Sequence, residues 1–174
     1  VEKALADKKA REGEDAMITQ FDCDSRGSSA ALATRMINVT DSVGQCKWNT
    51  VFLNVGIGIE LQAAALSAGL GHEISVEKLI NTASRIAAQE RAFAIREGLT
   101  RADDTLPKKL IGYQMPGTWP EDKIDAQSLE GMKDDYYTAM AWDVETGVPK
   151  RETLEGCGLS DVAADLEKMG KLTG

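Results

Sequence analysis

The segment from Ser75 to Gly98 is the strongest structural signal in this chain of 174 residues. Ser75 is a good N-cap, and Gly98 can end a helix in the left-handed conformation. Between them, apolar residues recur near the helical spacing i, i+3, i+4, i+7: Leu79, Ile80, Ala83, Ile86, Ala87 and Phe93. The pattern predicts a long helix over about residues 76–97 with one buried stripe.

The rest of the chain also favours helices. Segments that alternate Val, Ile, Thr or aromatic residues with polar ones are almost absent. Further helices are expected at residues 3–18, 30–37, 60–68, 126–140, 151–155 and 161–169, the last of them capped by Ser160. A polar break is expected at residues 22–29, an irregular segment at about 100–125 and a turn at 146–149. We predict a single all-α, multi-helical domain over residues 1–174, with C-terminal helices at 126–170.

Composition excludes some classes of function. The formal net charge is -8 and no cluster of Lys and Arg occurs, which argues against nucleic-acid binding. No apolar run is long enough to cross a membrane, and the charged N-terminus is unlike a signal peptide. Three cysteines make a poor disulfide framework, so we expect a cytoplasmic protein. Its partners should be proteins or small neutral molecules, and a homo-oligomer is compatible with these features.

Residues 41–46 place Asp41, Gly44, Gln45 and Cys46 close together in the sequence. The other cysteines, Cys23 and Cys157, are far away, so two interpretations of this polar turn arise. Cys46 is an inert thiol between two helices, or it is one ligand of a metal or iron–sulfur cluster whose other ligands lie elsewhere. Taken alone, the six residues favour the inert thiol.

Other polar residues offer weaker candidates. A charged group spans the end of the long predicted helix: Glu90, Arg91, Arg96, Glu97, Arg101, Asp103 and Asp104. A solvated surface is the simpler interpretation of this group, and an inter-domain surface is the alternative. The only histidine, His72, lacks a nucleophile at telling spacing and is expected at the surface, so no catalytic residue is assigned. Core or interface packing is expected for the main aromatic residues: Trp48, Trp119, Trp142, Tyr136 and Tyr137.

Three elements together resemble the C-terminal part of the aldehyde ferredoxin oxidoreductase family, whose enzymes hold tungsten or molybdenum on two pterins. The first is Asp-Ser-Val-Gly-Gln-Cys-Lys-Trp at residues 41–48, which is similar to the family's Asp-x-x-Gly-Leu-Cys-Lys-aromatic loop. The second comprises residues 85–86, 90–93, 96–98, 101, 103–104 and 106–107. The third comprises residues 135–137, 142–143, 147–149 and 154–159. The resemblance covers about residues 41–159, and residues 1–40 match only loosely.

The resemblance implies a role for the 41–48 loop. Cys46 would be the fourth ligand of a [4Fe–4S] cluster, Asp41 would bind the amino end of a pterin, and the backbone of Gly44 and Gln45 would wrap it. The intact enzyme would oxidise aldehydes to carboxylic acids and pass electrons through the cluster to ferredoxin. The order and spacing of the three elements favour the cluster interpretation of Cys46 over the inert thiol.

The chain also departs from the family. Gln45 replaces the usual leucine, and the run of three cysteines that supplies the other cluster ligands is absent from these 174 residues. The missing N-terminal and central domains, or a partner subunit, would have to supply them, so the chain alone is expected to be inactive. Two alternatives remain open: a non-catalytic helical scaffold module, and a family relative that acts on a non-aldehyde substrate such as an aromatic thioester.

Overall fold

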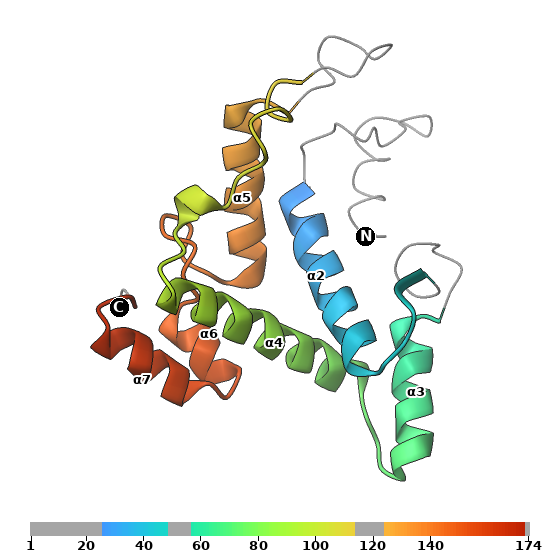
Figure 1. Ribbon diagram of the computed structural model, residues 1–174. Coiled ribbons are helices and arrows are strands. Elements are labelled where there is room, and N and C mark those ends of the chain that lie inside the picture. The colour runs from blue at the N-terminus through green and yellow to red at the C-terminus, as the bar shows by residue number, and fades with distance from the viewer. Residues whose placement is uncertain (1–25, 49–56, 114–123, 173–174) are drawn as a thin grey trace.

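The computed structural model describes residues 26–48, 57–113 and 124–172, and within them it is all-helical (Figure 1). The α-helices are α2 (Arg26–Ser42), α3 (Ile59–Leu70), α4 (Val76–Arg96), α5 (Ala126–Met140), α6 (Arg151–Gly156) and α7 (Ser160–Lys168). A short 3-10 helix, η2 (Arg101–Asp103), follows α4. In these three stretches the only β pairing is one isolated bridge between Trp142 and Pro149. The all-α prediction is confirmed, whereas the helix expected at residues 3–18 and the side chains of Cys23 and Trp119 lie outside the described residues.

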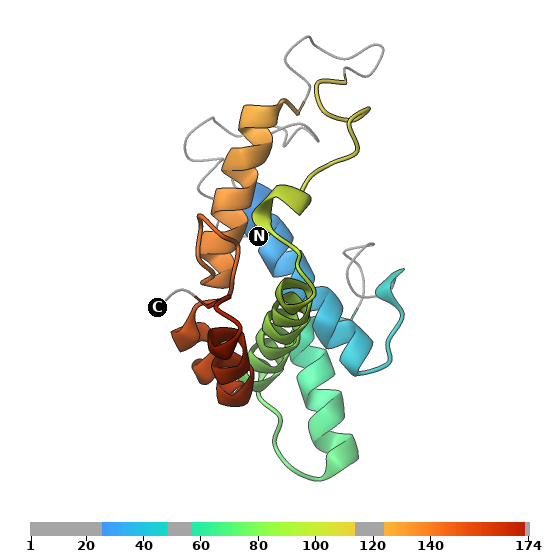
Figure 2. The same ribbon diagram turned by 60° about the vertical axis from the view of Figure 1, so that its left-hand side comes forward.

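Helix α4 is the centre of the arrangement, as Figures 1 and 2 show. It contributes to all three apolar clusters of the core. Ala88, Ala92 and Ile95 pack with α6 and α7, Ala87 packs with α2 and α5, and Leu79 and Ala83 pack with α2 and α3. A single helix therefore joins the α6–α7 pair to α2 and to the neighbours of α2, α3 and α5.

The caps predicted for α4 are confirmed, but near its C-terminal end the buried stripe differs from the predicted one. The Lys78 N–H donates to Ser75 Oγ at 3.1 Å, and Gly98 is left-handed with φ 103°. Phe93, expected in the stripe, is 58% exposed, while Arg91 is only 8% exposed. Two residues turn a helix by about 200°, so a stripe that continues through Arg91 leaves Phe93 on the opposite side.

Three boundaries differ from the sequence-based expectation. Helix α2 begins at Arg26, inside the expected polar break, because the backbone N–H and hydroxyl of Ser28 donate to Asp135 on α5 at 2.6 and 2.5 Å. Ser42 still belongs to α2, so the predicted turn begins only after it. Ser160 is the first helical residue of α7, whose N-cap is Leu159. None of the helices in the described part of the chain is long and apolar enough to span a membrane.

Candidate functional site

The loop after α2 folds back tightly on the last turn of the helix. The N–H groups of Gly44 and Gln45 donate to the carbonyls of Asp41 and Thr40 at 3.2 and 3.0 Å. Gly44 has φ 69°, a conformation that glycine adopts without steric cost. A Cβ atom added to Gly44 would have no heavy-atom neighbour within 4 Å. The turn thus needs glycine for its conformation and leaves the backbone open to approach.

The side chains of this loop present three kinds of polar atom. Asp41 Oδ2 lies 3.0 Å from Lys47 Nζ, which closes the loop with an ion pair. The Cys46 thiol is exposed. Gln45 Oε1 is buried and accepts no hydrogen bond from the described residues. A buried amide oxygen without a donor costs free energy, so this atom is suited to a ligand that brings an N–H group.

The polar atoms of the loop fit a place beside an iron–sulfur cluster and a pterin: the thiol could supply one cluster ligand, and the carboxylate and amide oxygens could accept hydrogen bonds from the pterin. Cysteine thiolate is the usual ligand of such clusters, and pterin rings carry amino and ring N–H donors for a carboxylate and an amide oxygen. The described residues contain no group of three or more His, Cys, Asp or Glu side chains that could hold a metal. A complete ligand set for a cluster at Cys46 is therefore not found within these residues.

A separate cavity of about 570 Å³ lies at the other half of α2, between α2, α4 and α5. Its apolar walls include Ala30, Met132 and Tyr136, and its polar wall includes Arg91 and Asp104. The lining residues come from four distant stretches of sequence. Helical spacing within one segment does not reveal such a cavity, and the sequence analysis missed it.

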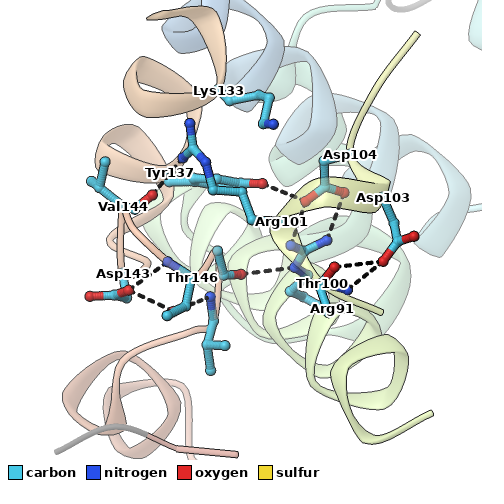
Figure 3. Close-up of polar contacts among 12 residues, drawn as sticks. Arg91, Thr100, Arg101, Asp103, Asp104, Lys133, Tyr137, Asp143, Val144 and Thr146 are labelled. Atoms are coloured by element: carbon cyan, nitrogen blue, oxygen red, sulfur yellow. Dashed lines mark hydrogen bonds and ion pairs between the residues drawn. The ribbon is translucent and has the colours of Figure 1, made fainter. Parts of the chain in front are cut away.

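Arg91 is the centre of a buried polar network at this cavity (Figure 3). Its Nη1 and Nη2 atoms donate to both oxygens of Asp104 at 2.9 and 2.5 Å, and its Nε donates to the Gly147 carbonyl at 2.8 Å. The hydroxyl of Tyr137 donates to the same carboxylate. The guanidinium also lies 5.7 Å from the centre of the Tyr137 ring and 5.6 Å from that of Trp142. These contacts join α4, the segment after η2, α5 and the turn at 146–149.

Arg101 makes a second set of contacts nearby. Its guanidinium donates to the Val144 carbonyl and to Glu130 and Asp134 on α5, at 2.5, 2.6 and 2.7 Å. A solvated surface is thus the wrong interpretation for Arg91 and Arg101, which are only 8% and 17% exposed and pair with carboxylates of other segments. It is right for Arg96 and Glu97, which are both exposed and pair with each other at 2.9 Å.

Burial and hydrogen bonding shift two pKa values in the Arg91 network. Burial raises the pKa of Tyr137, and the hydrogen bond to the Asp104 carboxylate raises it further. Burial alone would raise the pKa of Asp104, but the hydrogen bonds from Arg91 and Tyr137 outweigh it and hold that pKa below its usual value. The network is thus built for an ionised carboxylate and a neutral phenol.

Stability should fall at alkaline pH because of Tyr137. An unfolded tyrosine titrates near pH 10, whereas the folded chain holds the proton to higher pH, so above about pH 10 the unfolded state is favoured increasingly. We expect the free energy of unfolding to fall there by up to about 1.4 kcal/mol per pH unit from this group. Urea unfolding at pH 8–12 measures the slope, which should be shallower in Tyr137→Phe and unchanged in Tyr113→Phe, at an exposed tyrosine. Equal slopes in Tyr137→Phe and the unmodified chain would contradict this assignment.

The remaining predicted residues fall as follows. His72 is exposed, as expected. Tyr137 and Trp142 are buried in the core, at 3% and 5% exposure. Trp48, next to the Cys46 loop, is 64% exposed and is therefore not a core residue of this chain.

Comparison with known proteins agrees with the resemblance seen in the sequence. A family model described as "Aldehyde ferredoxin oxidoreductase, domains 2 & 3" matches residues 4–159, so the match includes most of the segment before residue 41. The tungsten-containing aldehyde ferredoxin oxidoreductase of Pyrococcus furiosus is 33% identical over 122 residues, or 70% of this chain and 19% of the relative. That of Pyrococcus abyssi is 29% identical over 139 residues, or 79% of this chain and 22% of the relative. The chain thus spans about a fifth of the length of these curated relatives.

A solved structure is similar over nearly the whole chain. It is the active site complex BamBC of benzoyl coenzyme A reductase in complex with 1,5-dienoyl-CoA, with a TM-score of 0.70 and 26% sequence identity. The similarity covers 94% of this chain and 23% of that one. With the family model covering residues 4–159, these matches show that the chain belongs to the aldehyde ferredoxin oxidoreductase family.

Proposed function

We propose that this chain is the C-terminal part of a tungsten- or molybdenum-pterin oxidoreductase that oxidises aldehydes to carboxylic acids. In this proposal the bound metal–pterin cofactor would supply the two-electron oxidation of an aldehyde with water, and a [4Fe–4S] cluster would supply the route for those electrons to ferredoxin. The chain contributes one edge of the pterin and cluster site and is inactive alone. The observation that carries the proposal is the 41–48 loop, where an exposed thiol, an open glycine turn and a buried oxygen with no donor among the described residues lie together.

Each residue of the loop has one role in the proposal. Cys46 binds one iron of the cluster through its thiolate. Asp41, already anchored by Lys47 at 3.0 Å, uses its remaining acceptor capacity for the pterin amino group. Gly44 lets the pterin approach the backbone, and Gln45 Oε1 accepts a hydrogen bond from it. The bound cofactor supplies the redox chemistry, and the loop orients it beside the cluster.

Replacing Cys46 by Ala in the intact enzyme should remove the cluster or weaken its binding, because the cluster loses one of four thiolate ligands. Iron content and the brown iron–sulfur absorption measure this loss. The purified 174-residue chain alone should show neither signal. Cys157→Ala is the matched control, because this partly buried thiol packs against the core formed by α4, α6 and α7. A normal iron content in the Cys46→Ala enzyme would show that the ligand assignment is wrong.

The structural neighbour supports a second candidate, a family relative that reduces an aromatic coenzyme A thioester. Its basis is the TM-score of 0.70 to the benzoyl coenzyme A reductase complex over 94% of this chain. Assays of the intact enzyme with aldehydes and with benzoyl coenzyme A plus a strong reductant separate the two substrates. Metal analysis of the same enzyme tests the third alternative, since a scaffold module would contain no stoichiometric iron, tungsten or molybdenum.

A further inference from the structure

Helix α3 has an apolar outer face that the described chain does not cover. Its outward residues recur at i, i+3, i+4, i+7 and are all exposed: Leu61, Ala64, Ala65 and Ala68. Leu61 is 58% exposed, and Ile57, just before the helix, is 38% exposed. The opposite face packs Ala63 against α2 and α4. A helix that is apolar on both faces is typical of an element buried on both sides.

The polar side chains of α3 do not serve this outer face. Gln62 Nε2 donates to the Ile57 carbonyl at 3.0 Å, and Ser67 Oγ accepts the Ile74 N–H at 2.8 Å. Both groups hold the segments that flank the helix. Glu60 is the only charged residue of α3. The outer face is therefore suited to an apolar protein surface, and unsuited to a charged ligand.

Helix α3 lies beside the end of α2 that leads into the Cys46 loop. Val39, in the last turns of α2 before the loop, shares one core cluster with Ala63 of α3. Figure 1 shows α3 near the N-terminal end of α4 and the loop above the start of α3, and in Figure 2 both remain on the same side of α4. Three buried side-chain polar atoms lack a hydrogen-bond partner within the described residues, and two of them, Gln45 Oε1 and Gln62 Oε1, lie in these two elements. Among the described residues, this region therefore leaves both an apolar face and buried polar atoms without partners.

We propose that the outer face of α3 docks against the part of the same enzyme that carries the other three cluster ligands. This inference rests on the proposed function, because a cluster shared with Cys46 brings that part against the loop and hence next to α3. The curated relatives are about five times longer than the matched region, so family members have protein enough to cover this face. Docking on α3 fixes the Cys46 loop relative to the three remaining ligands.

Cross-linking in the intact enzyme tests the proposal. A photo-reactive phenylalanine analogue is placed at position 65 and, in a second variant, at position 68, and the cross-linked peptides are identified by mass spectrometry. We expect both positions to cross-link to the part that holds the three-cysteine run. Position 126, an exposed alanine at the start of α5, is the matched control and should not reach it. Cross-links only within these 174 residues, only to a second copy, or to nothing would overturn the proposal.

The iron content of the same preparations separates this inference from the proposed function. Loss of iron in Cys46→Ala with cross-links from α3 only to a second copy supports the cluster assignment and overturns the docking. Cross-links to the cysteine-bearing part with normal iron in Cys46→Ala support the docking surface, and overturn the cluster role from which it was inferred.

Discussion

Replacing Arg91 by Ala should lower the free energy of unfolding of this chain by about 3 kcal/mol, the loss typical of breaking a mostly buried ion pair. The substitution leaves the Asp104 carboxylate without its two charged hydrogen bonds and the Gly147 carbonyl without its donor. It also removes the cation that lies against the Tyr137 and Trp142 rings. The Asp104 side chain is 28% exposed, so water partly solvates the unpaired carboxylate. The expected loss of stability is therefore at the lower end of the range for broken buried ion pairs.

Urea unfolding followed by circular dichroism measures this loss. Arg96→Ala is the matched control on the same helix, because Arg96 is half exposed and its ion partner is the exposed Glu97. We expect that control to change stability by no more than about 0.5 kcal/mol. Arg91→Lys should not restore the stability, because an ammonium cannot reproduce the two-pronged contact with the carboxylate. A loss below about 1 kcal/mol in Arg91→Ala would refute the central role of the network.

Replacing Gly27 by Ala should destabilise the chain by about 2–3 kcal/mol, because the new methyl group has no space. A Cβ atom at this position would lie 2.2 Å from the Met132 carbonyl oxygen and 2.5 Å from the Tyr136 nitrogen. Both are backbone atoms of α5, which, unlike the end of a side chain, cannot rotate away from the new methyl group. Helix α2 would have to move from α5 and would weaken the two hydrogen bonds from Ser28 to Asp135.

Gly131→Ala is the matched control and should have the opposite sign. Gly131 lies inside α5, and a Cβ atom there would have no heavy-atom neighbour within 4 Å. Alanine favours the helix over glycine by roughly 0.5–1 kcal/mol, so this variant should be more stable than the unmodified chain. Thermal and urea unfolding measure the change in stability of each variant, which should be a loss for Gly27→Ala and a gain for Gly131→Ala. Equal stability of Gly27→Ala and Gly131→Ala would contradict the close contact between the backbones of α2 and α5 at Gly27.

The α-helices were the most predictable feature of this chain. The caps at Ser75 and Gly98 and the apolar spacing between them predicted α4 within one residue at its C-terminal end. The positive φ of Gly44 and Gly147 likewise agrees with the predicted turns. Such features depend on interactions between residues that are close in the sequence, so they can be predicted from the sequence alone. The roles of Asp41, Gly44, Gln45 and Cys46 rest on family resemblance and the geometry of the loop, and the Cys46→Ala experiment tests the ligand assignment.

The sequence by itself determined the helical class of the chain, the family to which it belongs and the loop with the single thiol. Only the tertiary structure decided that Arg91 is buried while Phe93 is exposed, and that α2 touches α5 through Gly27. The physical reason is distance along the chain. Helical spacing records which face of a segment is apolar, but Arg91 is buried because Asp104, Tyr137 and Gly147 converge on it from other segments. A charge in an apolar stripe therefore signals a partner, and only the fold identifies that partner.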